Sequence, residues 1–126
     1  MLNLVTETEG VAGAVLVRAI EPIVGIDIMA ERRGGRRGVE MTNGPGKVAQ
    51  ALGIGLEDNG TPLGESLVVY DAGADPSCIQ CGGRIGLSAG HELPLRYWVA
   101  GSEYVSKGRP GPRPRKRRGE SRKEPE

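Results

Sequence analysis

The chain has 126 residues, enough for one domain, and its formal net charge is +1. Residues 108–126 carry eight Lys or Arg and three Glu, whereas the other 107 residues carry nine basic and thirteen acidic side chains. This asymmetry excludes the main part of the chain from the proteins that hold nucleic acid by bulk charge alone. Two cysteines, no secretory signal and no long apolar run favour a cytoplasmic protein that does not enter a membrane.

Two strands are predicted first, at residues 2–6 and 14–20, and the polar turn between them would pair them as an antiparallel hairpin. The second run is almost entirely aliphatic, which is typical of a central strand covered on both faces. Arg18 interrupts this run and, with a period of two, would share a side with Leu16. Because a charge among aliphatic side chains is costly, Arg18 should either meet a carboxylate or line a cleft that a polar or anionic ligand enters.

A helix is predicted next, at residues 25–33, where apolar side chains recur at helical spacing. A basic cluster follows, made of Arg32, Arg33, Arg36 and Arg37. Two interpretations of this cluster stay open. It is either a solvated helix end, where cations complement the helix dipole, or a surface that contacts phosphate groups.

The best-defined predicted helix spans residues 42–53. Thr42 or Asn43 would cap it, a proline falls in its first turn, and Gly53 would end it. Gly44 and Gly46 leave the backbone bare at its positive end, beside Lys47, and such a helix start can receive a phosphate. The segment is not a Walker loop, because the upstream glycine and the magnesium-binding Ser or Thr are missing.

Four further short strands are predicted, at residues 67–70, 84–87, 97–100 and 104–106. From residue 107 onward the chain lacks an apolar period, so a disordered basic tail is expected. Cys78 and Cys81 form a Cys-x-x-Cys pair, for which His91 is the only other good zinc ligand. We therefore interpret them as ordinary loop cysteines and expect no metal.

Several segments carry a family resemblance when they are taken together. They are residues 2–5, 14–22 (Ala-Val-Leu-Val-Arg-Ala-Ile-Glu-Pro), 42–53 (Thr-Asn-Gly-Pro-Gly-Lys-Val-Ala-Gln-Ala-Leu-Gly), 84–87 (Arg-Ile-Gly-Leu) and 94–106. Their order and spacing resemble the C-terminal half of the alkyladenine, or 3-methyladenine, DNA glycosylases of the human and Bacillus type. The resemblance implies an α+β fold, in which residues 1–106 form part of a single mixed domain with a curved, mainly antiparallel sheet and two helices.

The resemblance also implies a function in base-excision repair. Members of this family flip a damaged nucleotide out of duplex DNA and hydrolyse the N-glycosidic bond of alkylated purines such as 3-methyladenine. They are monofunctional hydrolases that need no metal or cofactor. The implied partner is double-stranded DNA with damaged purine bases. We expect a monomer that acts in the bacterial cytoplasm at the nucleoid.

Site residues follow from the resemblance position by position. Arg18 matches the arginine that helps to hold the attacking water, and Ile85 matches the residue whose backbone carbonyl also binds that water. Asn3 matches the asparagine that obstructs the 2-amino group of guanine, and Arg84 and Gly86 flank Ile85 in the substrate-binding segment. The residues expected to contact DNA are Gly44, Gly46, Lys47, Arg32 and Arg36.

Two departures from the family pattern are visible. Gly83 stands where the family usually has proline, and the sequence lacks the Glu-Ala-Tyr motif that carries the general base. The chain therefore reads as a truncated enzyme, with a non-catalytic fragment or a weak nucleic-acid-binding protein as the alternative. Alone, it should release no base above background and should expose an apolar patch.

Overall fold

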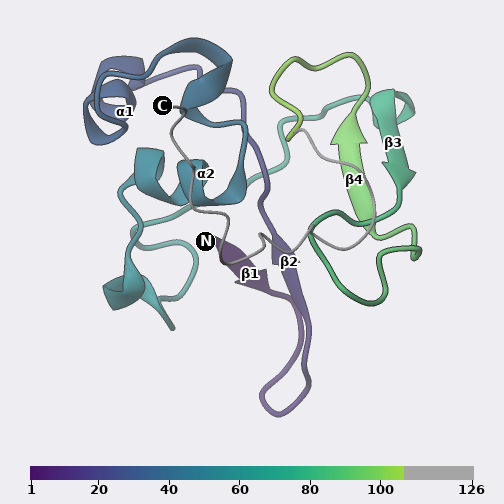
Figure 1. Cartoon of the computed structure of the whole chain (residues 1–126). Coiled ribbons are helices and arrows are strands. Elements are labelled where there is room, and N and C mark those ends of the chain that lie inside the picture. Colours follow the sequence, from purple (N-terminus) through teal and green to yellow (C-terminus); the bar gives the residue numbers. More distant parts are fainter. Residues whose placement is uncertain (107–126) are drawn as a thin grey trace, which may run out of the picture. The chain divides into compact units, whose positions relative to one another are not determined.

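The computed structural model describes residues 1–106. They fall into two compact units, residues 1–80 with 98–106 and residues 81–97. The elements in chain order are β1 (Asn3–Val5), β2 (Ala14–Leu16), α1 (Ile26–Arg32), α2 (Pro45–Leu52), β3 (Ile79–Gly82) and β4 (Arg96–Val99) (Figure 1). Short 3₁₀ helices occupy Gly38–Met41, Leu56–Asp58 and Pro76–Cys78. The expected basic tail, residues 107–126, lies outside the described residues.

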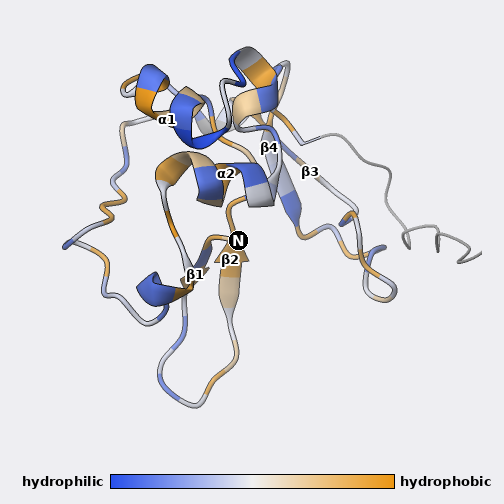
Figure 2. Ribbon diagram, turned by 60° about the vertical axis from the view of Figure 1, so that its left-hand side comes forward, coloured by the Kyte–Doolittle hydropathy of each residue, from blue (hydrophilic) through white to orange (hydrophobic). Residues whose placement is uncertain are grey.

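Both predicted helices are confirmed, and they supply the buried core of the first unit. Each helix has hydrophilic and hydrophobic stretches, as Figure 2 shows. The hydrophobic cluster consists of Met29, Ala30, Met41 and Ala51, with Leu52 packed against it. Glycines bound the helices, because Gly25 before α1 and Gly53 after α2 adopt φ of 74° and 69°, which other residues rarely reach. Within the described residues, no helix is both long and apolar enough to cross a membrane.

The start of α2 differs from the prediction. Gly44 is the N-cap residue, no side chain caps the helix, and Pro45 occupies the first turn. Thr42 is fully buried, and its hydroxyl donates to the carbonyl oxygen of Ile20 at 2.7 Å instead of capping α2. The expectation that Thr42 or Asn43 caps the helix was therefore wrong. The buried Thr42 hydroxyl bonds to the backbone of Ile20 and is therefore not available to the start of α2.

The predicted hairpin is confirmed in a shorter form. Strands β1 and β2 pair antiparallel, with Asn3 opposite Leu16 and Leu4 opposite Val15. The interpretation of the second run as a central strand covered on both faces is wrong, because within residues 1–106 β2 pairs only with β1. Val5 is 75% exposed and Val15 is 55% exposed. An aliphatic run therefore does not distinguish a buried strand from an open one.

The later strands were predicted least well. Residues 67–70 and 104–106 form no strand, and in residues 84–87 only Ile85 makes an isolated bridge. Strand β3 was not predicted, whereas β4 lies one residue before the expected strand. Strand formation depends on a pairing partner more than on β-branched content, so the exposed Val68 and Val69 stay unpaired. Strands β3 and β4 form the second two-stranded sheet, which completes a small α+β fold.

Candidate active site

One face of the β1–β2 hairpin carries two of the predicted site residues. Asn3 lies opposite Leu16, so their side chains share a face, and Arg18 follows two residues later on the same side. The ladder continues past β2, because the N–H of Val17 donates to the carbonyl of Leu2 at 3.0 Å. Diagonal neighbours across such a pair are about 7–8 Å apart, within reach of a long side chain. The register therefore makes Asn3 and Arg18 diagonal neighbours across the hairpin.

Arg18 is half-buried, and its backbone is fixed on both sides. The Val17 bond to Leu2 holds one side, and Ile20 holds the other by donating its N–H to the carbonyl of Thr42 at 3.3 Å. The side chain of Arg18 donates from Nε to the hydroxyl of Ser106 at 3.3 Å. Arg18 thus sits on a well-held backbone although it lies outside β2.

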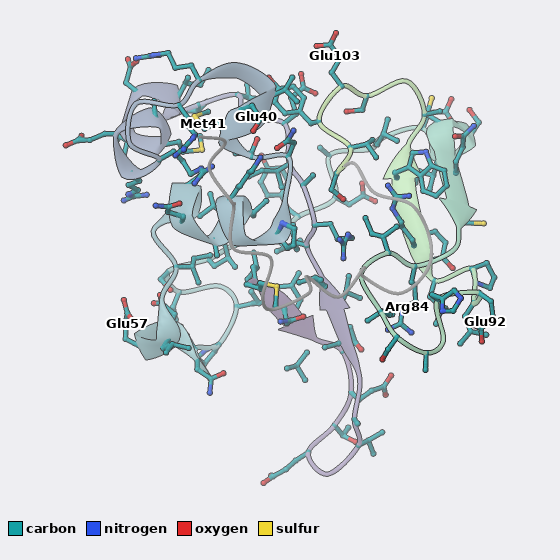
Figure 3. All side chains as sticks on the ribbon, in the orientation of Figure 1. Glu40, Met41, Glu57, Arg84, Glu92 and Glu103 are labelled. Carbon is teal, nitrogen blue, oxygen red and sulfur yellow. The ribbon has the colours of Figure 1, made fainter. Side chains whose placement is uncertain are left out.

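The predicted residues Arg84, Ile85 and Gly86 belong to the second unit, residues 81–97. Ile85 is 7% exposed, and the half-buried Arg84 donates its backbone N–H to the carbonyl of His91 at 2.8 Å. Figure 3 shows Arg84 on the loop that also carries Glu92. His91 Nδ1 lies 3.8 Å from the Glu92 carboxylate, too far for a hydrogen bond, and within residues 1–106 this buried nitrogen has no hydrogen-bond partner. The bond between Arg84 and His91 therefore closes a short loop within this unit.

The arginine cluster divides into one internal and three external members. Arg33 is 7% exposed, and its Nε donates to the carbonyl of Met41 at 3.0 Å. Its other nitrogens donate to the carbonyl of Glu40 at 3.4 Å and to the side-chain oxygen of Gln50. Arg33 therefore ties α1 to α2 and to the 3₁₀ turn between them, a role that neither interpretation of the cluster included.

The other three arginines remain at the surface. Arg32 donates to the carbonyl of Ala51 at 3.2 Å, and Arg36 donates to the carbonyl of Arg33 at 3.4 Å. Arg37 forms an exposed ion pair with Asp27 at 2.6 Å. Arg32 and Arg36 make these bonds to neutral carbonyls, so their charges are not cancelled by them.

The start of α2 also carries predicted DNA-contacting residues. Lys47 Nζ lies 2.7 Å from the carboxylate of Glu40 and 2.7 Å from the side-chain oxygen of Asn43. Gly46 is exposed, and no atom lies within 4 Å of the place where a Cβ would stand. Gly44 is extended, and a Cβ there would lie 3.6 Å from Lys47. The bare backbone predicted at this helix start is therefore present, but Lys47 is paired internally.

Within residues 1–106, neither cysteine belongs to a group of side chains that could hold a metal ion. Cys78 and Cys81 are free and exposed. Among residues 1–106, no group of three or more His, Cys, Asp or Glu side chains could hold a metal ion.

Sequence reasoning missed Arg33, Thr42 and Ser106 as residues that organise the site. Each bonds to a different segment of the chain, and the sequence separation ranges from 7 residues for one bond of Arg33 to 88 residues for Ser106. Buried polar side chains must find partners, but a single sequence does not show which partner each one takes.

Comparison with known proteins agrees with the sequence resemblance. The model of the methylpurine-DNA glycosylase family matches residues 1–103. A relative from Chlorobaculum parvum named as a 3-methyladenine DNA glycosylase is 50% identical over 120 residues, which are 94% of this chain and 57% of the relative. A relative of the same name from Bacillus subtilis is 44% identical over 110 residues, which are 85% of this chain and 56% of the relative.

This chain therefore spans a little more than half the length of these relatives. No solved structure matches it at a significant level. Because the family model covers most of the chain, from residue 1 to residue 103, the chain belongs to the methylpurine-DNA glycosylase family.

Proposed function

We propose that this chain carries the water-binding side of a monofunctional DNA glycosylase, which hydrolyses the N-glycosidic bond of alkylated purines in duplex DNA. Family membership over residues 1–103 supports the reaction class. The observation that carries the proposal is the hairpin face, where Asn3 and the half-buried Arg18 share one side. The reaction needs a polar side chain that discriminates between purines and a cation that binds the water and the phosphate. Asn3 and Arg18 would supply these two groups.

In the proposed reaction, water attacks the anomeric carbon and the bond to the purine nitrogen breaks. Arg18 would hold the water and the adjacent phosphate, because guanidinium groups bind oxyanions through several N–H donors. The resemblance also gives the backbone carbonyl of Ile85, in the second unit, a water-binding role. Asn3 would obstruct the 2-amino group of normal guanine. A proton acceptor is also required, and the resemblance assigns it to a glutamate motif that these 126 residues do not contain.

Binding to DNA would use the surface cations and the bare helix start. Arg32 and Arg36 keep their charge while donating to neutral carbonyls, and Lys47 would exchange Glu40 for a phosphate. The backbone at Gly44 and Gly46 offers N–H groups at the positive end of α2.

The proposal extends to the organisation of the chain. Residues 1–106 would form part of a single mixed domain with a curved, mainly antiparallel sheet, and the basic residues after 107 would add binding that is independent of sequence. The partner would be double-stranded DNA with damaged purines, bound by one copy of the protein. The proposed place of action is the bacterial nucleoid.

The test is base release from duplexes that contain one 3-methyladenine or one hypoxanthine. We compare this chain with a chimera that joins it to the part of the Chlorobaculum parvum relative outside the match. The chimera should release the damaged base, and strand breaks should appear only after alkali, as expected for hydrolysis without lyase activity. Release by the chimera that is no greater than in an undamaged duplex would contradict the proposal, and breaks without alkali would contradict the monofunctional mechanism.

A specificity variant tests the role of Asn3. In the chimera, Asn3→Ser should raise release of normal guanine relative to 3-methyladenine by on the order of tenfold, since a shorter side chain no longer blocks the 2-amino group. An unchanged ratio would remove Asn3 from the substrate-binding site.

A further inference from the structure

We propose that Ser106 is a positioning residue for Arg18, and the catalytic consequence of this role rests on the proposed function. The Nε–H of Arg18 donates to the hydroxyl oxygen of Ser106 at 3.3 Å. Ser106 is only 5% exposed, and both residues belong to the same compact unit although 88 residues separate them. A buried hydroxyl thus meets the inner end of the guanidinium group, next to its aliphatic stem.

The chemistry of this contact suits an arginine that must act elsewhere. A carboxylate in the place of Ser106 would cancel positive charge on Arg18, whereas a hydroxyl accepts the bond without contributing a negative charge of its own. An arginine side chain carries about 2 kcal/mol of rotamer entropy. Fixing Nε before substrate binds removes part of that cost from the reaction, because the plane of the guanidinium is then set in advance.

The backbone around Arg18 is held by other groups. Val17 donates to Leu2 on one side, and on the other side Thr42 both accepts from and donates to Ile20. Because these bonds do not involve Ser106, loss of the Ser106 hydroxyl should leave the backbone of Arg18 in place. The contribution of Ser106 proposed here is therefore to the orientation of the Arg18 side chain, through the bond from Nε.

A purely structural role for Ser106 predicts a different result in a double-mutant comparison. Arg18→Lys keeps the charge but removes Nε–H and the planar guanidinium that the bond to Ser106 orients. If Ser106 acts through Arg18, Ser106→Ala should lower kcat in the wild-type chimera and have no further effect in the Arg18→Lys background. If Ser106 only anchors the chain, its substitution should cost the same in both backgrounds.

The first measurement needs no enzymatic activity. In this chain labelled with ¹⁵N-arginine, the Nε–H signal of Arg18 is assigned by its loss in Arg18→Lys. In the wild type, this Nε–H should exchange with solvent more slowly than that of the surface residue Arg36. The exchange rate of Arg18 should rise at least tenfold in Ser106→Ala and stay close to the wild-type rate in Ser106→Thr. Exchange in the wild type as fast as that of Arg36 overturns the proposal even if Ser106→Ala does not fold.

The second measurement is base release by the chimera. Ser106→Ala should lower kcat by on the order of 10- to 100-fold with little change in KM, since a misplaced catalytic group costs this much, and Ser106→Thr should recover most of the rate. An exchange result as expected, together with no base release by any variant, would reject the proposed function and keep the positioning role. An unchanged kcat in an active Ser106→Ala chimera would overturn that role in catalysis.

Discussion

The helical region of the first unit buries apolar side chains, whereas its β1–β2 hairpin exposes several of them. In residues 26–53, Met41 is 1% exposed and Ala51 is fully buried, whereas Val5 and Val15 of the hairpin are more than half exposed. Figure 3 shows Met41 next to Glu40 within the helical region. The helices thus have a core of their own, while the hairpin leaves a valine exposed on each of its two faces. We infer that most of the stability comes from the helices, and that the proposed chemistry lies on the hairpin.

The same contrast separates two arginines. Arg33 in the helical region is buried and donates to three acceptors on two other segments. Arg18 on the hairpin is half-buried and donates from Nε to Ser106. We therefore expect substitution of Arg33 to affect mainly stability and substitution of Arg18 to affect mainly activity.

The largest effect on stability is expected for Arg33→Met. The substitution keeps the aliphatic stem but leaves the buried carbonyl of Met41 and its neighbours without a donor, at about 1–3 kcal/mol for each group. We expect a loss of about 3 kcal/mol in the free energy of unfolding, measured by urea denaturation with circular dichroism. Arg36→Met is the matched control and should change stability by less than about 0.5 kcal/mol. Equal losses would show that the internal role of Arg33 is wrong.

The largest effect on activity is expected for Arg18→Ala. In the chimera, loss of a donor at the reaction centre should lower kcat about 100-fold. Arg36→Ala should change kcat much less, because Arg36 would act only on the outer phosphate groups. If base-release rates fall equally in both variants, Arg18 is not at the reaction centre.

Amide hydrogen exchange compares the two regions directly. The amides of α2 should exchange at least about tenfold more slowly than those of Leu4 and Val15, which are cross-strand partners in the hairpin, since local opening is easiest where few apolar contacts are lost. Protection of the hairpin amides equal to that of α2 would contradict this expectation. It would mean that the exposed valines do not lower the free energy of local opening in the hairpin.

A smaller effect is expected for Lys47→Met. Its ion pair with Glu40 is partly exposed, so the free energy of unfolding should fall by about 0.5 kcal/mol. If Lys47 also contacts phosphate, the slope of binding affinity against salt concentration should decrease by about one for every DNA sequence. Lys47→Arg is the control for charge, and an unchanged slope in Lys47→Met would remove this residue from the DNA-binding surface.

The smallest effect concerns pH. The backbone N–H and hydroxyl of Ser77 donate to Asp75 and lower the pKa of this exposed carboxyl below its usual value. A lowered pKa in the folded chain means that the stabilisation is present above the pKa of the unfolded chain and is lost as pH falls through the folded value. A titration of the Asp75 carboxyl carbon by NMR should give the lowered pKa, and Ser77→Ala should raise that pKa part of the way to its usual value. No difference between the variants would exclude the hydroxyl as a cause.

Local signals made the helices predictable from sequence. Within a helix, proline fits only the first turn, and Gly53 adopts the left-handed conformation that ends a helix. Local residues therefore mark both ends of α2. The hairpin was also predictable, because a short polar turn joins two short apolar runs. The missing information was non-local. Residues 67–70 have strand composition but no partner, and the bond between Arg18 and Ser106 joins distant segments.

The contact between Arg18 and Ser106 also bears on the order of folding. Closing a loop of 88 residues costs about 4 kcal/mol of chain entropy, far more than one hydrogen bond returns. The α1–α2 contacts close much shorter loops, so the helical region should form early and the Ser106 contact only near the end of folding. A partly folded chain would then contain the helices and the hairpin, but not an oriented Arg18. The proposed reaction centre would thus be withheld from DNA until the whole unit is assembled.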